Sequence, residues 1–257
     1  MSSLNNDKPY ENNLSEKQFN GYFVPNHSAK LIRESIENNT APFLPDSSGA
    51  IKANPIFNGN KGFCLTAKDL IPLQIIQGEN SNVVVTFNTV NKAGIKIKEG
   101  EKGFFYNYQK EDKSMGVSQY FFPEQTEDPE KIKEFVAPKI AKGIKLLSPD
   151  KTIEIKSSEP EQYLGTYLAA CKTGATVKVS PEIAEQFKQN VMPILKNQTL
   201  IHKDKEMDSL SDLMFKSERN AIDVVNALSK EKTQQQTKSQ EQMPQKKQHK
   251  DIERDFG

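Results

Sequence analysis

Four segments between residues 82 and 122 have the composition of β-strands, and they constrain the fold more than any other feature of the chain. They read NVVVTF, IKIK, GFFYNY and VSQYFF, and they are rich in β-branched and aromatic residues. From about residue 123 onward, several segments instead begin with Asp-Pro or Ser-Pro and repeat apolar residues at helical spacing. Strands and helices do not alternate as they do in βαβ units. The sequence therefore predicts an α+β fold.

Composition divides the chain of 257 residues into four parts. Residues 1–25 are polar and rich in Asn, Ser and Glu, and we expect this N-terminal segment to be disordered. Residues 26–122 should form a small mixed α/β domain with a β-ribbon or sheet, and residues 123–230 a mainly helical region. Residues 231–257 are dominated by Gln, Lys, Ser and Glu, which predicts a disordered, low-complexity polar tail.

Charge and cysteine content exclude several classes of protein. The chain has 35 Lys and Arg residues against 34 Asp and Glu residues, so its net charge of +1 neither favours nor opposes a nucleic-acid partner. Cys64 and Cys171 lie far apart, without companions at metal-binding spacing, and we expect buried thiols in a reducing compartment. No apolar run approaches the ~18 residues of a membrane span. We therefore expect a soluble, cytoplasmic protein that does not contact a membrane.

Motifs for catalysis and for cofactors are not found in the sequence. The histidines, His27, His202 and His249, have no partner at the spacing of a zinc site, and no His-Glu-x-x-His motif occurs. No glycine-rich phosphate loop ending in Lys-Ser or Lys-Thr is present. Acidic residues are plentiful, but no pair of carboxylates stands out for acid–base chemistry. We expect no catalytic residue, no metal and no cofactor, and hence no enzyme.

Lysines are concentrated in the stretch TFNTVNKAGIKIKEGEKG, which spans residues 86–103. If its IKIK segment is a strand, the two isoleucines face one side while Lys96 and Lys98 face the other. The following Gly-Glu-Lys-Gly turn then brings Lys102 toward the same side. This geometry predicts a cationic face on a short β-ribbon. A solvated lysine-rich hairpin without a ligand is the simpler alternative interpretation.

Aromatic residues lie before and after these lysines, and the combination is typical of proteins that bind single-stranded nucleic acid. Cations follow the phosphates, while exposed aromatic rings stack with unpaired bases. Phe87, Lys92 and Tyr106 are candidates for such contacts on either side of the IKIK segment. Strand aromatics are nevertheless more often part of a core than of a binding surface, so a packing role stays open.

Several of these segments together resemble the N-terminal DNA-binding domain of ArdC-type antirestriction proteins. LIRESIENNTAPF is similar to a family helix with a Thr-Ala-Pro-Trp exit, with Phe43 in place of the tryptophan. NPIFNGNKGF resembles a family loop that contains Gly and Asn. TFNTVNKAGIKIKEGEKG resembles the family's Thr-Phe-Asn-Gln-Ala and Lys-Gly-Glu-Lys-Gly sequence, and GVSQYFF resembles the strand that closes the domain. The resemblance covers about residues 26–122.

The resemblance implies DNA binding, with single strands preferred over double strands, by a protein of a plasmid, phage or other mobile element. It also implies a role in handling or protecting transferred DNA during conjugation, as in antirestriction. The candidate DNA contacts are then Phe43, Lys61, Phe87, Lys92, Lys96, Lys98, Lys102 and Tyr106. Full-length family members also carry a metalloprotease-like domain with a His-Glu-x-x-His helix. Residues 123–257 have no such motif, so neither metal nor peptidase activity is carried over.

A second interpretation places the chain in a different class, that of protein–protein interaction modules. In it the DNA-binding face is a relict, and the helical region binds a restriction subunit or a component of the conjugation machinery. The amphipathic segment from about Ser209 to Lys230 is the candidate surface, although burial against its own domain also explains its apolar stripe. Glu99 and the balanced net charge favour this interpretation, whereas the Gly-Glu-Lys-Gly turn favours DNA binding.

Overall fold

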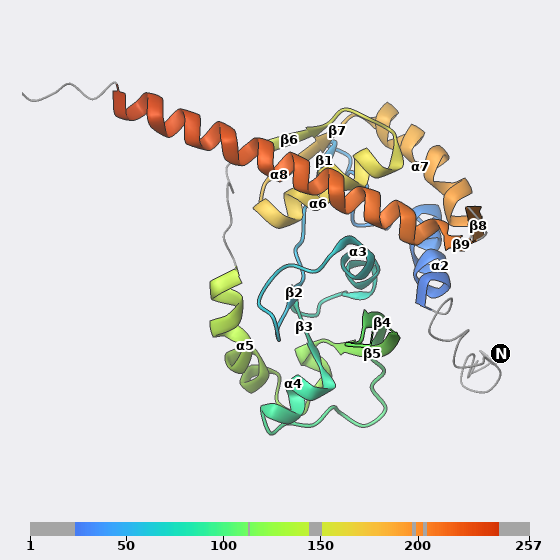
Figure 1. Cartoon of the computed structure of the whole chain (residues 1–257), viewed down its shortest axis with the longest axis vertical. Coiled ribbons are helices and arrows are strands. Elements are labelled where there is room, and N and C mark those ends of the chain that lie inside the picture. Colours follow the sequence, from blue (N-terminus) through green and yellow to red (C-terminus); the bar gives the residue numbers. More distant parts are fainter. Residues whose placement is uncertain (1–23, 113, 144–150, 197–198, 203–204, 242–257) are drawn as a thin grey trace, which may run out of the picture.

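The computed structural model describes residues 24–112, 114–143, 151–196, 199–202 and 205–241 (Figure 1). The expected disordered segment at residues 1–25 lies outside the described residues except for its last two positions. The same holds for the polar tail from residue 242 onward.

Helices and strands both contribute to the molecule, and the predicted α+β class is confirmed. The helices are α2 (Val24–Glu37), α3 (Ala67–Ile76), α4 (Phe87–Lys92), the 3-10 helix η2 (Pro123–Gln125), α5 (Pro129–Gly143), α6 (Pro160–Thr173), α7 (Pro181–Lys196) and α8 (Ser209–Glu241). The strands are β1 (Ala50–Ile51), β2 (Phe57–Asn58), β3 (Val83–Thr86), β4 (Phe104–Gln109), β5 (Met115–Phe121), β6 (Thr152–Ile155), β7 (Thr176–Val179), β8 (Thr199–His202) and β9 (Lys205–Asp208).

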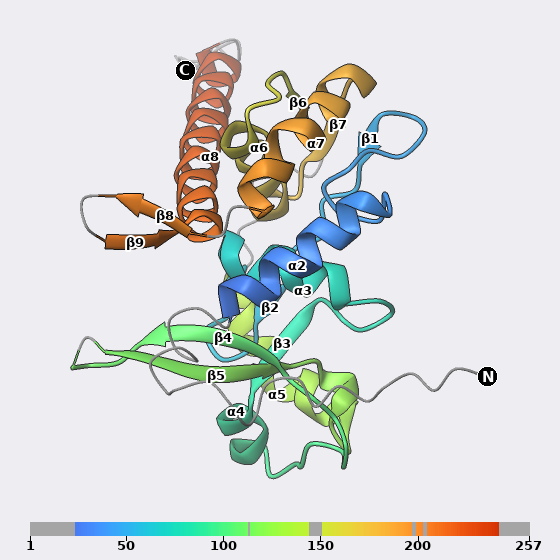
Figure 2. The ribbon, with the colours of Figure 1, turned by 90° about the vertical axis from the view of Figure 1, so that its right-hand side faces the viewer.

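Three of the predicted β segments lie in a four-stranded sheet with the order β2-β3-β5-β4. β2 runs parallel to β3, whereas β5 is antiparallel to both β3 and β4. β4 and β5 form a long hairpin, which Figure 2 shows in side view. Val84 and Tyr120 belong to one buried cluster, while Val85 and Phe121 belong to another. Both faces of the sheet are therefore covered, which explains why β3 is a continuous apolar run rather than an alternating one.

Helices from different parts of the chain cover these two faces. The larger cluster includes Ile32 of α2 and Leu70 of α3, and the smaller cluster includes Val90 of α4 together with Ile132 and Val136 of α5. In Figure 2, α2 and α3 accordingly lie above the β4–β5 hairpin and α4 lies below it. α4 and α5 are thus attached to the face of the sheet that α2 and α3 leave free.

A second, three-stranded sheet joins the two halves of the chain. Its order is β1-β7-β6, with β1 antiparallel to β7 and Ile51 opposite Val177. The larger buried cluster likewise contains residues from α2 and α3 as well as from α6, α7 and α8. The predicted parts 26–122 and 123–230 therefore share one continuous core, and a domain boundary between them stays a prediction.

The amphipathic helices predicted after residue 123 bury the stripes expected of them. Leu164, Tyr167, Leu168 and Cys171 of α6 are all buried. α6 packs along α8, whose predicted apolar stripe supplies several further buried residues, including Leu213. The apolar side of α8 is thus used for the protein's own core.

α8 is longer than the sequence pattern indicates. We expect a helix from about Ser209 to Lys230, but it continues to Glu241, and Figure 1 shows its C-terminal part running away from the body. The first eleven residues of the predicted disordered tail, 231–241, are therefore helical. This stretch contains Lys, Glu and Gln, residue types with favourable helix propensity. Neither α8 nor any other helix within the described ranges is long and apolar enough to cross a membrane.

Candidate nucleic-acid interface

One side of the candidate site is formed by α4, which begins where β3 ends. The hydroxyl oxygen of Thr86 accepts a hydrogen bond from the backbone N–H of Thr89 at 3.4 Å and so caps the helix. The sequence pattern places Phe87 in the strand, but it is the first residue of α4, and its side chain is 55% exposed. Lys92 ends the helix, where a cation is favourable, and it is also exposed. α4 thus presents an aromatic ring and an ammonium group to solvent.

The opposite side is formed by the β4–β5 hairpin. Tyr106 and Tyr108 are two positions apart on β4, so they lie on the same face of the sheet. Tyr106 stacks on Tyr120 of β5 with ring centroids 3.9 Å apart and planes 14° apart, which holds it in place. The Tyr108 ring covers Gly116 of β5, where a Cβ atom would lie 2.7 Å from Tyr108 Cζ. Tyr108 is 41% exposed and presents its ring to solvent.

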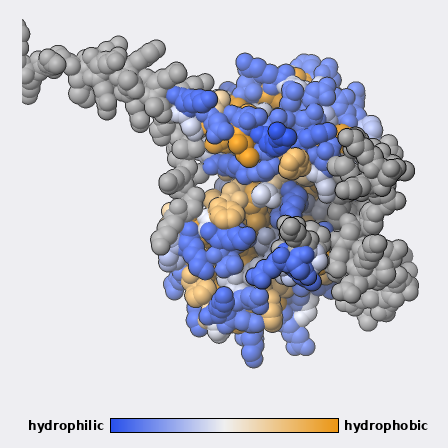
Figure 3. All heavy atoms as spheres, viewed as in Figure 1, coloured by the Kyte–Doolittle hydropathy of each residue, from blue (hydrophilic) through white to orange (hydrophobic). Residues whose placement is uncertain are grey.

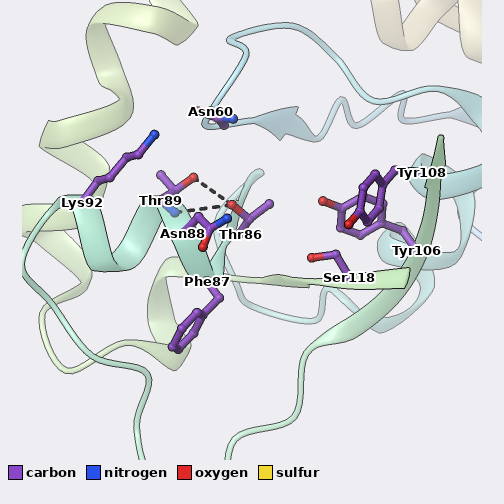
Figure 4. Close-up of a pocket in the computed structure, with 9 residues that line it drawn as sticks. All are labelled: Asn60, Thr86, Phe87, Asn88, Thr89, Lys92, Tyr106, Tyr108 and Ser118. Atoms are coloured by element: carbon purple, nitrogen blue, oxygen red, sulfur yellow. Dashed lines mark hydrogen bonds between the residues drawn. The ribbon is translucent and has the colours of Figure 1, made fainter. Parts of the chain in front are cut away.

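α4 and the hairpin enclose a cavity of about 410 Å³ (Figure 4). Its wall contains aromatic, hydroxyl, amide and amino groups, which belong to Asn60, Thr86, Phe87, Asn88, Thr89, Lys92, Tyr106, Tyr108 and Ser118. In Figure 4, Lys92 lies on the α4 side, the two tyrosines lie on the hairpin side, and Asn60 lies between the two sides. The cavity therefore combines aromatic surfaces with one cation and several hydrogen-bonding groups.

The electrostatics of the cavity differ between its two sides. Lys92 is the cation among the lining residues, and it makes no ion pair with any residue that the structure describes. On the hairpin side, burial raises the pKa of the Tyr106 hydroxyl, which stays protonated at neutral pH. Burial also raises the pKa of Asp69 of α3 to about 6, and this carboxyl lies near enough to raise the pKa of both Tyr106 and Tyr120. An anionic group is therefore favoured at the α4 side.

Three of the predicted DNA contacts line this cavity, and a fourth lies next to it. Phe87, Lys92 and Tyr106 are lining residues. Lys61 follows the lining residue Asn60, and its ammonium nitrogen lies 5.8 Å from the centroid of the Phe63 ring. The fold thus brings together predicted contacts from α4, β4 and the turn after β2. That these residues contact DNA stays a prediction.

The predicted β-ribbon of the IKIK segment is wrong. Residues 93–103, all of them described, hold no strand and form only an isolated bridge between Ile97 and Thr126. Gly94 and Gly100 have positive φ values of 68° and 84°, so the backbone turns on either side of the segment. These turns leave too little extended chain for a ladder.

The three lysines of this segment do not form one cationic row. Lys98 donates a hydrogen bond from its ammonium group to the backbone oxygen of Glu124 at 2.8 Å. Lys102 lines a second cavity, of about 290 Å³, together with Glu101 and Glu124. Lys96 is exposed. Since Lys98 is bound to a carbonyl and Lys102 has acidic neighbours, the expected cationic track is not formed, and DNA contacts by these lysines stay a prediction.

The expectation that Phe43 offers a stacking surface is also wrong. Its side chain is 1% exposed. It meets the ring of Phe187 edge-on, with centroids 5.8 Å apart and an angle of 82°, and the ring of Tyr167 at 6.2 Å and 70°. Its backbone oxygen accepts a hydrogen bond from the Tyr163 hydroxyl at 3.0 Å. The ring therefore anchors the segment after α2 to α6 and α7.

Several lining residues were not selected from the sequence. Tyr108 belongs to the aromatic run GFFYNY, and its spacing of two from Tyr106 is a signal that places both rings on one face. Asn60, Asn88 and Ser118 carry no such signal, because small polar residues are common in turns and on exposed strand positions. Only the folded chain shows that they share a wall with the aromatic residues.

The described parts of the chain offer neither a clustered metal site nor an activated thiol. They contain no group of three or more His, Cys, Asp or Glu side chains that could hold a metal ion. Cys171 is buried, as predicted, and burial raises its pKa to about 12. Cys64 is only partly exposed, and burial raises its pKa to about 11. Thiols with raised pKa values are poor nucleophiles at neutral pH.

Fold and site together define an α+β protein with an aromatic, cationic cavity at the end of a mixed sheet. No protein family and no curated protein matches the sequence. Among solved structures, the chain is similar to the crystal structure of the antirestriction protein ArdC from plasmid R388 in its metal-free form. The sequence identity is 11%, the TM-score is 0.49, and the match covers 82% of this chain and 99% of that chain.

Proposed function

We propose that this chain binds single-stranded DNA at the cavity between α4 and the β4–β5 hairpin, and that it does so without catalysing a reaction. The arrangement of Phe87, Lys92 and Tyr108 carries this proposal, because two exposed rings and an exposed ammonium group border one cavity. Proteins that bind single strands need aromatic faces for unpaired bases and cations for phosphates.

The geometry favours a single strand over a duplex. In a duplex the faces of the bases are covered by their neighbours, so Phe87 and Tyr108 would find no base to stack on. The cavity volume of about 410 Å³ lies within the range of about 300–1,000 Å³ that is usual for small-ligand sites. An unstacked base fits such a space, and Asn88 and Ser118 offer hydrogen-bonding groups to its edge.

The biological task that we propose is the handling of transferred DNA by a protein of a mobile element, with protection against restriction as its purpose. The sequence resemblance to ArdC-type proteins supports this step, and the cavity supports the binding on which it depends. A protein that covers single strands during transfer needs no catalytic group, in keeping with the proposed absence of catalysis.

Titration of labelled oligonucleotides tests the proposal. Single- and double-stranded probes are compared at about 50 and about 200 mM salt, with wild type and with the variant Phe87→Ala/Lys92→Ala. We expect wild type to bind the single strand at micromolar concentration or tighter, to bind the duplex more weakly, and to lose affinity as salt rises. The variant should bind the single strand about tenfold more weakly, because a stacking contact contributes about 1–3 kcal/mol.

A second variant, Lys96→Ala/Lys98→Ala/Lys102→Ala, separates the cavity from the lysine-rich segment. We expect it to bind more tightly than the Phe87→Ala/Lys92→Ala variant, because its lysines lie outside the cavity wall. A larger loss in the triple variant would place the DNA along the lysine-rich segment instead. Equally weak binding of both probes by wild type and all variants at low salt would contradict DNA binding altogether.

A protein partner is the alternative function, and one observation favours it. The predicted apolar stripe of α8 is largely buried against α6, but Phe215 and Ile222 lie seven residues apart on its outer side and are 63% and 49% exposed. Large exposed apolar residues on one helix face are typical of protein contacts. In this alternative, a restriction or conjugation component binds the outer face of α8, and the variant Phe215→Ala/Ile222→Ala abolishes that binding without changing DNA affinity.

A further inference from the structure

A second group of aromatic and basic side chains lies beside the cavity. It consists of Lys61 and Phe63 in the turn after β2, and of Lys131, Phe135 and Lys139 on α5; we name these five residues the turn–helix platform. The turn after β2 includes Asn60, which lines the cavity, so the two surfaces are adjacent. The expected contacts include Lys61 but none of the other four residues.

The turn holds Lys61 and Phe63 in a defined position. The side-chain oxygen of Asn58 accepts hydrogen bonds from the backbone N–H groups of Asn60 at 3.0 Å and of Lys61 at 3.1 Å. The backbone N–H of Asn58 donates to the oxygen of Phe63 at 3.0 Å, which closes the turn. The Phe63 ring is 51% exposed, with the ammonium nitrogen of Lys61 5.8 Å from its centroid.

α5 presents a similar combination on one face. Lys131, Phe135 and Lys139 are four residues apart and therefore lie above one another on the helix. The ammonium nitrogen of Lys139 lies 5.7 Å from the centroid of the Phe135 ring, which is 40% exposed. Both lysines are exposed, and neither makes an ion pair within the described part of the chain. Glu130 of the same helix is bound to Lys133 at 3.0 Å.

The turn and α5 are in direct contact, so the two parts of the platform adjoin each other. A Cβ atom at Gly62 would clash with the backbone oxygen of Lys139, and one at Gly59 would lie 3.0 Å from Val136 Cγ1. Only glycine allows the two backbones to approach this closely, and Gly62 also has a positive φ of 85°. Figure 3, in the view of Figure 1, shows separate hydrophobic side chains on the otherwise hydrophilic lower half of the molecule, where the sheet and α5 lie.

We propose that a single DNA strand bound in the cavity continues past Asn60 onto the turn–helix platform, which binds the next nucleotides. The inference rests on the proposed function and assigns the ligand as a strand longer than the cavity can hold. Three lysines without described carboxylate partners complement a polyanion, and two exposed rings, each beside a lysine, offer faces to unpaired bases. A protein partner would also find apolar rings here, but it would not account for the accumulation of unneutralised lysines.

The length dependence of binding tests the inference. Labelled oligothymidylates of about 4 and about 15 nucleotides are titrated against wild type and against Phe63→Ala/Phe135→Ala and Lys131→Ala/Lys139→Ala variants. We expect both variants to bind the short probe as wild type does and the long probe at least about fivefold more weakly. The lysine variant should also show a smaller salt dependence for the long probe alone, because it has lost phosphate contacts.

The variant Phe215→Ala/Arg219→Ala is the matched control. It removes an exposed ring and a neighbouring cation from α8, away from the cavity; Arg219 Cζ lies 5.9 Å from the centroid of the Phe215 ring. It should bind both probes as wild type does. Binding of the long probe by wild type and by both platform variants with equal affinity would overturn the inference and leave the proposed function intact. Failure of wild type to bind either probe would overturn both. The lysine variant changes only exposed side chains, so it remains informative if the phenylalanine variant is destabilised.

Discussion

The side-chain carboxylate of Glu218 in α8 accepts a hydrogen bond from the backbone N–H of Ala67, the first residue of α3, at 3.0 Å. The N-cap residue Thr66 makes no side-chain hydrogen bond to this helix, so the carboxylate from α8 serves as its cap. The other oxygen of Glu218 lies 2.7 Å from the ammonium nitrogen of Lys172 in α6. One side chain of α8 thus connects α3, which covers the sheet, to α6 and α8.

We predict that Glu218→Ala lowers the free energy of unfolding by about 2 kcal/mol, because it removes a helix cap and leaves a partly buried lysine without its partner. Asp223→Ala is the control on the same helix, since Asp223 is exposed, and it should change stability by less than about 0.5 kcal/mol. Urea denaturation of both variants measures the difference. Equal stability of the two variants would show that the Glu218 contacts contribute little.

We predict that the buried carboxyl of Asp69 makes the stability of the protein depend on pH. Burial raises the pKa of its carboxyl from 3.8 to about 6, so between these values the folded protein keeps a proton that the unfolded chain releases. Stability therefore falls as pH rises through this window, and above pH 6 the cost of the buried charge amounts to roughly 2–3 kcal/mol. Asp69→Asn should remove this dependence, so that the variant gains stability relative to wild type between pH 4 and pH 7.

Denaturation curves of wild type and Asp69→Asn at several pH values between about 4 and about 7.5 provide the measurement. The difference between the two proteins, rather than the stability of either, is the quantity to follow, because other groups titrate identically in both. A difference that stays constant across this range would mean that Asp69 ionises at its ordinary pKa.

Gly116→Ala should weaken DNA binding with little effect on stability. A Cβ atom at this position would lie 2.7 Å from Tyr108 Cζ, so the ring must leave its place beside the cavity. Because the ring end is flexible and 41% exposed, it can move at a cost below about 1 kcal/mol. We expect an affinity loss similar to that of Tyr108→Ala. Wild-type affinity in Gly116→Ala together with a loss in Tyr108→Ala would show that the displaced ring still contacts the strand.

Phe43 and Phe87 should respond in opposite ways to truncation. Phe43→Ala removes a ring that is 1% exposed and should lower the free energy of unfolding by about 3–5 kcal/mol. Phe87→Ala removes a ring that is 55% exposed and should leave stability within about 1 kcal/mol while reducing affinity for single strands. Thermal unfolding and oligonucleotide titration of both variants separate the two roles. A stable Phe43→Ala protein with reduced DNA affinity would restore the expectation drawn from the sequence.

Part of the candidate site could be predicted because its signals are local. The basic and aromatic stretch of residues 86–108 predicts Phe87, Lys92 and Tyr106 as contacts, and the fold places all three around one cavity. The expected β-ribbon at residues 95–98 does not form, because a strand needs a pairing partner along its whole length. This segment pairs with the chain only at one isolated bridge, between Ile97 and Thr126. A period-two pattern specifies which side chains share a face, but it does not supply the neighbouring strand.

The sequence by itself determined the α+β class, the strands β3, β4 and β5, and the buried stripes of α6 and α8, because composition and periodicity act over a few residues. Only the tertiary structure decided that Phe43 is inside and Phe87 outside, that Tyr108 and Asn60 border the same cavity, and that Gly62 lets a turn touch α5. These are contacts between segments far apart in the chain. They depend on how the helices and the sheet fill the space between them, which no local pattern encodes.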